Sequence, residues 1–310
     1  MTYYLICNLN HARGLSRYLI SLVIYALVHK AGAMNQRLLR PGQVEDILHV
    51  SVTTQVKPPL VSFIIPSTLS RLELLNRTLE SLQNQTVSNW EAIIGVDVEM
   101  TQSEETIHLA DQVRGRDDIR IKYHNIHTGT LDRGRHHNGS GGVRNQIIMQ
   151  YARADWVAFI DDDDTLSPYY VEMLMRSIHR EPRLDICIFR MQGYPGPTDL
   201  LPPPRTYDLH VGQVGISFAV RKSLFVDQGI LFVPHQSEDY FYLRDAFDHN
   251  AKIRSSTCNM YFIRQYPPSV EQKPMCRLED KPIRLVNDKA TFDYWEEQAY
   301  LKSLKEKESN

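Results

Sequence analysis

Short apolar runs alternate with segments of helical periodicity between residues 60 and 160, and this alternation restricts the fold more than any other feature. The expected strands span residues 60–65, 90–96, 119–123 and 155–160. The expected helices between them span residues 71–84, 103–114 and 142–151. Apolar runs of strand length separated by amphipathic helices predict an α/β fold with a mostly parallel central sheet flanked by helices.

The pattern continues less regularly after residue 166. We expect helices over residues 168–179 and 238–247, and strands over residues 185–190, 214–220 and 259–264. A stretch rich in proline and glycine at residues 194–205 predicts an extended loop.

An apolar run at residues 18–28 is flanked by Arg13, Arg17 and Lys30. It is shorter than the ~20 residues that span a bilayer. It is consistent with a helix that packs on the domain or lies on a membrane surface, a signal or signal-anchor, or an unstructured extension. We therefore expect a cytoplasmic protein that can associate peripherally with membranes through residues 13–30; the alternative location is the lumen of the secretory pathway.

Charge and cysteine content exclude some functional classes. The formal charge of −2 shows no basic excess, so nucleic acid is not an expected partner. Cys7, Cys187, Cys258 and Cys276 form no CxxC pair. We expect free thiols, without a structural zinc site or a dense disulfide framework.

Four consecutive aspartates, Asp161 to Asp164, follow the apolar run at residues 155–160. Ligands of parallel sheets bind at the carboxyl ends of strands, where Asp97 also lies, so these acids are expected to face one crevice. Mg²⁺ and Mn²⁺ prefer carboxylate oxygens, and four like charges are costly without a cation. We assign the metal to Asp161 and Asp163, a ribose hydroxyl to Asp162, and the start of the next helix to Asp164. The alternative is a solvated acidic turn or a helix cap.

Residues 60–268 resemble the family 2 inverting glycosyltransferases of the GT-A fold, within the nucleotide-diphospho-sugar transferase superfamily. The similar segments are residues 61–66, 77–86, 91–97, 142–145, 159–164, 238–239 and 261–267. Each segment is moderately specific, whereas their order and spacing together are highly specific.

The resemblance implies a division of the chain into functional parts. Residues 59–165 would bind the nucleotide-sugar, and residues 166–275 would bind the acceptor and carry the catalytic base. Residues 1–58 would form an N-terminal extension and linker, and residues 276–310 a helical tail. The implied reaction is metal-dependent transfer of a hexosyl or N-acetylhexosaminyl group, from a UDP-sugar to a hydroxyl on a glycan, lipid or protein.

The resemblance also assigns roles to individual residues. Asp97 would read the nucleotide base, and Arg144 would offset the diphosphate charge. Asp239 would be the general base, although residues 237–239 can also be interpreted as a helix cap. Further contacts are assigned to Pro66, Ser67 and Thr68 on the nucleotide-sugar, and to Glu238 and His235 on the acceptor or phosphates.

The chain departs from the family pattern at two places. Ser67, Thr68 and Leu69 stand where the family usually has Thr-Tyr-Asn, so the aromatic residue that often packs on the base is missing. Tyr266 stands where a histidine is common. The Gln-x-x-Arg-Trp motif of processive synthases is absent, which favours a single transfer per encounter.

Two other functions remain as alternatives. A catalytically degenerate protein could bind a sugar or nucleotide without transferring it, and the altered residues 67–69 are compatible with that. A nucleotidyltransferase can share the architecture, but it carries a glycine-rich loop after the first strand. Residues 66–71 contain no glycine, which argues against it.

Overall fold

The computed structural model describes residues 58–68, 71–97, 117–127, 140–193, 200–233, 237–265 and 273–286. The chain divides into two units, Met1–Lys57 and Pro58–Asn310, and all of the described residues belong to the second. The segment at residues 13–30 and the helix expected at 103–114 therefore lie outside the described residues. Of the helical tail expected over residues 276–310, residues 276–286 are described and contain a short strand, Arg284–Leu285, and no helix; the rest lies outside the described residues.

The first half of the sheet is parallel, as the sequence predicts. Its strands are β1 (Val61–Ser67), β2 (Trp90–Asp97), β3 (Ile121–Ile126) and β4 (Trp156–Phe159). They lie side by side in the order β3-β2-β1-β4. Ser67 is in register with Val96, and Ile64 with Phe159, so β1, β2 and β4 end at the same edge of the sheet.

The second half extends the same sheet with mixed directions. Its strands are β5 (Thr165–Leu166), β6 (Ile186–Gln192), β7 (Leu200–Leu201), β9 (Phe218–Arg221) and β10 (Ile253–Phe262). The order continues β4-β9-β6-β10-β5, with β9 antiparallel to both neighbours and β10 parallel to β6. A separate two-stranded sheet pairs β8 (Asp208–Leu209) with β11 (Arg284–Leu285).

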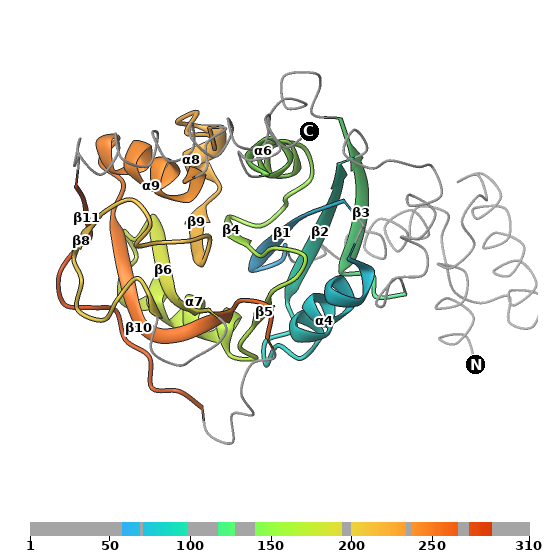
Figure 1. The fold of residues 1–310 in the computed structure, drawn as a ribbon, viewed down its shortest axis with the longest axis horizontal. Coiled ribbons are helices and arrows are strands. Elements are labelled where there is room, and N and C mark those ends of the chain that lie inside the picture. The colour runs from blue at the N-terminus through green and yellow to red at the C-terminus, as the bar shows by residue number, and fades with distance from the viewer. Residues whose placement is uncertain are drawn as a thin grey trace, which may run out of the picture. The chain divides into compact units, whose positions relative to one another are not determined.

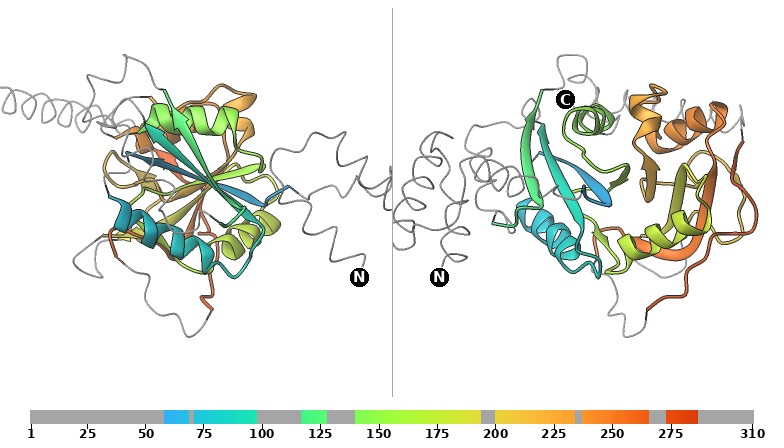
Figure 2. Two further views of the ribbon diagram at one scale, coloured as in Figure 1. Left: turned by 90° about the vertical axis from the view of Figure 1, so that its right-hand side faces the viewer. Right: turned by 180° about the vertical axis from the view of Figure 1, so that it is seen from behind.

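Helices cover both faces of the central sheet (Figures 1 and 2). One face carries α4 (Leu72–Gln83) and α7 (Tyr170–Arg180). The other carries α6 (Gly141–Gln150), α8 (Ser223–Val226) and α9 (Glu238–Asp248). Helix α4 buries Leu75, Leu79 and Leu82, which recur at helical spacing and so form one apolar stripe toward the sheet.

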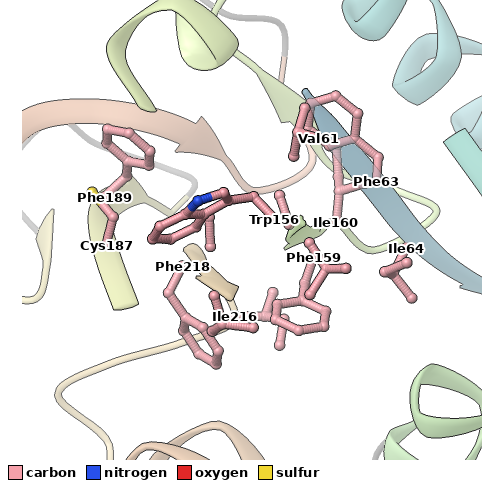
Figure 3. Close-up of a cluster of buried hydrophobic side chains, with 14 of the residues drawn as sticks. Val61, Phe63, Ile64, Trp156, Phe159, Ile160, Cys187, Phe189, Ile216 and Phe218 are labelled. Atoms are coloured by element: carbon pink, nitrogen blue, oxygen red, sulfur yellow. The ribbon is translucent and has the colours of Figure 1, made fainter. Parts of the chain in front are cut away.

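An aromatic cluster fills the space between the middle of the sheet and α8 and α9. The ring centroids of Phe159 and Phe218 are 5.3 Å apart, and those of Phe232 and Tyr242 are 4.5 Å apart. Figure 3 shows Phe159 and Phe218 among the buried hydrophobic side chains of the core. Burying each such side chain stabilises the fold by about 1.5–3 kcal/mol.

Several element boundaries differ from the sequence-based expectation. The last long strand begins at Ile253 instead of residue 259, because Ile253 to Ser255 pair with β6 although the stretch contains polar residues. Strand β1 continues through Pro66. Its pairing with β4 reaches only Ile64, and a proline is tolerated where a strand has no further partner on that side.

Two cysteines form a disulfide, which corrects the expectation of free thiols. Cys258 of β10 and Cys276 are joined, with Cα atoms 5.4 Å apart. The segment around Cys276 runs beside β10, where the Thr257 N–H donates to the Arg277 carbonyl at 2.9 Å. The spacing of 18 residues matches no motif, so only this chain pairing brings the sulfurs together. Cys187 is a free, buried thiol whose pKa burial raises to about 12.

Helix α6 packs closely on β2 at Gly95. A Cβ atom there would lie 2.5 Å from Ile147 Cδ1 and 2.9 Å from Val143 Cγ1. We expect Gly95→Ala to lower the free energy of unfolding by about 1–3 kcal/mol, because overpacked cores must shift. Urea unfolding measures this. Gly193→Ala is the matched control, since its nearest atom, Ile263 Cδ1, is 4.0 Å away; equal effects would contradict the packing argument.

Candidate active site

Three adjacent strand ends define one edge of the sheet. β1 ends at Ser67, β2 ends at Asp97, and the aspartate run begins one residue after β4, beyond Ile160. These strands are neighbours and run in the same direction, so their carboxyl ends meet, as the sequence predicts. Asp97 is buried there. Pro66 and Ser67 are the last residues of β1, and Thr68 follows them.

Asp162 and Asp163 are buried and already paired. The Ser67 hydroxyl donates to Asp162 Oδ2 at 2.6 Å. The Arg71 guanidinium donates to Asp162 Oδ1 at 2.9 Å and also to Asp163 Oδ2. Arg264 Nε donates to the same Asp163 oxygen at 2.7 Å. The carboxylate assigned to a metal thus has two guanidinium partners in this structure.

Asp164 does not start a helix, which corrects the sequence-based assignment. Helix α7 begins at Tyr170, and strand β5 lies between. The Asp164 carboxyl accepts from the Tyr261 hydroxyl at 2.7 Å and from the Arg264 backbone N–H at 2.9 Å. Burial and the nearby Asp161 charge raise the pKa of Asp164 above its usual range. Asp164 therefore anchors the end of β10 to the aspartate run.

Asp161 is the exposed member of the run. Its side chain is 40% exposed, and Arg144 Nη2 lies 2.5 Å from its Oδ1. Arg144 itself is only 3% exposed, and its Nη1 pairs with the buried Glu238. Arg144 thus bridges Asp161 and Glu238 from the interior. It is not a solvated arginine on the surface of α6.

Glu238 caps α6 although it belongs to α9. Its carboxylate accepts the Ser140 N–H at 3.2 Å and the Gly141 N–H at 2.9 Å. A carboxylate at a helix N-terminus satisfies unpaired N–H groups and interacts favourably with the helix dipole. Because it is buried and engaged by both α6 and Arg144, Glu238 joins two helices and does not face solvent.

Asp239 lies next to this pair in a different environment. Its side chain is partly exposed, yet its Oδ1 is buried without a hydrogen-bond partner in the described part of the chain. Burial raises the pKa of Asp239 to about 7; the Arg144 charge lowers it, and the Glu238 and Asp161 charges raise it. A carboxyl group with such a pKa can accept a proton near neutral pH.

The structure adds site residues that the sequence reasoning did not assign. Arg71, Tyr261 and Arg264 contact the aspartate run. The side-chain amide of Asn145 forms two hydrogen bonds with the Phe232 backbone, at 2.9 and 3.0 Å. Tyr261 and Arg264 lie in residues 261–267, which resemble the family, so this resemblance could have pointed to them as site residues. His235 lies outside the described residues.

The chemistry of the run suits a divalent cation only in part. Carboxylates are the right ligands, and Mg²⁺ is usually held by one or two of them plus substrate phosphates. Within the described ranges, however, no group of three or more His, Cys, Asp or Glu side chains is arranged to hold a metal. Asp161 is accessible, whereas Asp163 would have to exchange its guanidinium partners.

The sheet and the aspartate run at its carboxyl edge define a protein of the GT-A class. Residues 62–263, more than half of the chain, match the model of Glycosyl transferase family 2, and the chain belongs to this family.

Curated relatives match over part of their length. EpsH of Bacillus subtilis (strain 168) is 34% identical over 133 residues, 43% of this chain and 34% of that protein. The GalNAc(5)-diNAcBac-PP-undecaprenol beta-1,3-glucosyltransferase of Campylobacter jejuni subsp. jejuni is 32% identical over 118 residues, 38% of this chain and 34% of that protein. The chain thus spans about a third of the length of these relatives.

Solved structures support the fold. TarS 1–349 of S. aureus aligns with a TM-score of 0.51 and 20% identity, covering 66% of this chain and 60% of that one. Its complex with UDP-GlcNAc aligns with a TM-score of 0.51 and 19% identity, covering 67% and 59%. Among the residues that the structure describes, none of the helices has the length and apolarity needed to cross a bilayer.

Proposed function

We propose that the protein is an inverting glycosyltransferase that moves a sugar from a nucleotide-sugar to a hydroxyl group. The observation that carries this proposal is the Asp239 carboxyl group: its Oδ1 is buried without a hydrogen-bond partner in the described part of the chain, beside Glu238, which Arg144 links to Asp161 of the aspartate run. Burial raises its pKa to about 7. Inversion requires a base on the side of the acceptor, opposite the leaving diphosphate. Asp239 accepts the proton of the acceptor hydroxyl. At the same time the hydroxyl oxygen attacks the sugar, and the nucleoside diphosphate leaves.

The strand ends hold the donor in this proposal. Asp97 and the residues at the end of β1 bind the nucleoside, and Asp162 binds the ribose. Asp161 and Asp163 would hold Mn²⁺ or Mg²⁺, and the ion would supply positive charge that neutralises the leaving diphosphate. Arg144 is buried between Asp161 and Glu238, so it acts by holding these carboxylates in place.

The donor and the acceptor are proposed from the relatives. The UDP-GlcNAc complex of TarS shows a related fold in the presence of a UDP-sugar, which supports a UDP-linked donor. The name of the Campylobacter relative includes an undecaprenol-linked saccharide, which supports a glycan or lipid-linked acceptor. A membrane-bound acceptor would fit a protein that works at a membrane surface, in the synthesis of a polysaccharide or glycoconjugate.

Titration calorimetry with UDP tests the donor site. We expect UDP to bind, and Mn²⁺ to tighten binding by at least about tenfold, because the ion joins the aspartates to the phosphates. Asp161→Asn should reduce this metal effect, whereas Asp248→Asn, an exposed carboxylate on α9, should not. A screen of UDP-, GDP- and dTDP-sugars for released nucleoside diphosphate then identifies the donor. Absence of nucleotide binding with Mn²⁺ present would refute the proposal.

A further inference from the structure

Two arginines from distant parts of the chain meet on the aspartate run. Arg71 precedes α4 and pairs with Asp162 at 2.9 Å and with Asp163. Arg264 follows β10 and pairs with Asp163 at 2.7 Å. Both guanidinium groups reach the same oxygen, Asp163 Oδ2. The two arginines therefore occupy the Asp163 oxygen that a bound metal ion would need as its ligand.

The two partners of these ion pairs differ in accessibility. The side chains of Asp162 and Asp163 are 4% and 7% exposed, whereas those of Arg71 and Arg264 are 42% and 65% exposed. A long, exposed arginine side chain can move away without disturbing the core. The carboxylates cannot follow, because the turn at residues 161–164 fixes their backbone: the Asp164 N–H donates to the Asp161 carbonyl at 3.2 Å. The Ser67 hydroxyl also holds Asp162.

The Arg264 backbone is held separately from its side chain. Its φ of 52° lies in the left-handed region that non-glycine residues seldom adopt. Its N–H donates to Asp164 Oδ1 at 2.9 Å, which stabilises this conformation. The Cα atom is thus fixed beside the aspartate run, while the exposed guanidinium group can exchange partners.

The charges of these groups determine when the arginines can leave the aspartates. A buried carboxylate that loses its last counter-ion is strongly destabilised. Arg71 therefore cannot leave Asp162, and the two arginines cannot both leave Asp163, unless another cation arrives. A metal ion alone must compete with both guanidinium groups at Asp163. A nucleoside diphosphate offers these groups the oxygen pairs that guanidinium binds bidentately. Metal and diphosphate together can therefore replace the ion pairs, with both arginines paired again.

We propose that Arg71 and Arg264 are exchangeable counter-ions that move from Asp162 and Asp163 to the diphosphate when a metal ion enters, so that metal and nucleotide bind cooperatively. The inference rests on the proposed function and deepens it. It assigns these arginines to donor loading, and to pairing with Asp162 and Asp163 before the metal ion enters.

The test measures Mn²⁺ affinity without nucleotide, by electron paramagnetic resonance of the unbound ion. We expect Arg71→Gln and Arg264→Gln each to bind Mn²⁺ more tightly than the parent, and the double variant to gain roughly 5–150-fold, the range of typical coupling energies. UDP affinity in the presence of Mn²⁺ should fall. The ratio of Mn²⁺ affinities with and without UDP should therefore shrink.

Arg284→Gln is the matched control, because Arg284 is an exposed arginine that pairs with Asp208 away from the aspartate run. It should leave both affinities unchanged. Thermal unfolding shows whether each variant is folded, and each single variant tests the direction of the change if the double variant does not fold. Mn²⁺ affinity that stays equal to the parent's, or weakens, in the folded single variants overturns the inference.

Failure of the proposed function and failure of the counter-ion exchange give different results. If the parent protein binds no UDP even with Mn²⁺ present, the proposed function fails. If the parent binds UDP and Mn²⁺ but the arginine variants keep the same coupling, only the counter-ion exchange fails.

Discussion

Replacing Asp239 by asparagine is expected to remove sugar transfer while donor binding is retained. A positioned general base contributes roughly 10²–10⁴-fold to such reactions, so kcat should fall by that factor. The change removes the proton acceptor but keeps the shape of the side chain, and Asp239 is not among the groups that hold the donor in this proposal. Released nucleoside diphosphate measures the rate, and calorimetry with UDP and Mn²⁺ measures binding.

The raised pKa of Asp239 predicts how the rate and the stability depend on pH. The base must be deprotonated, so kcat/KM should fall as the pH decreases below about 7. The raised pKa also means that the charged form is disfavoured in the fold. The stability associated with the neutral form is complete below the unfolded pKa of about 3.9 and is lost as the pH rises to about 7.

Asp239→Asn should therefore stabilise the fold above pH 7, by about 2–4 kcal/mol, and have little effect near pH 4. The same substitution at Asp245, whose half-exposed side chain on α9 pairs with His249, should change neither the transfer rate nor its pH profile. An asparagine variant at position 239 that still transfers sugar would refute the assigned base. A variant with no gain in stability at high pH would refute the raised pKa.

Replacing Arg144 by methionine is expected to destabilise the protein more than any other single change considered above. Arg144 is buried between Asp161 and Glu238, and its guanidinium lies 5.6 Å from the Phe232 ring centroid. Removing one partner of a buried ion pair costs about 3–5 kcal/mol, because the remaining charge stays buried and unpaired. The buried charge left here belongs to Glu238, which α6 holds in place.

Urea unfolding of a double-mutant cycle measures this effect. The Arg144→Met and Glu238→Gln pair should cost less than the sum of the single changes, because the second change removes the unpaired charge. Arg244→Met is the control: Arg244 forms an i,i+4 pair with Asp248 on α9, worth about 0.3–0.5 kcal/mol. If Arg144→Met costs no more than Arg244→Met, Arg144 does not have the structural role assigned to it here.

The sequence predicted the first half of the fold well for a physical reason. Strands β1, β2 and β4 are mostly apolar and buried on both faces, and α4 shows one clear apolar stripe, so the local pattern identifies them. Boundaries were wrong where polar residues continue a strand, as in β10, or where the helix start was placed too early, as before α7. There the pairing of distant segments overrides the local pattern.

The sequence by itself determined that the aspartate run would follow a strand, at the same sheet edge as Asp97. Only the tertiary structure decided what these acids contact: Arg71 and Arg264 on Asp163, and Arg144 between Asp161 and Glu238. It also decided that Glu238 caps α6 and that Cys258 joins Cys276. The reason is physical, because periodicity and turn chemistry act between neighbours in the chain. Ion pairs across the sheet depend on strand order, which exists only once the whole sheet has formed.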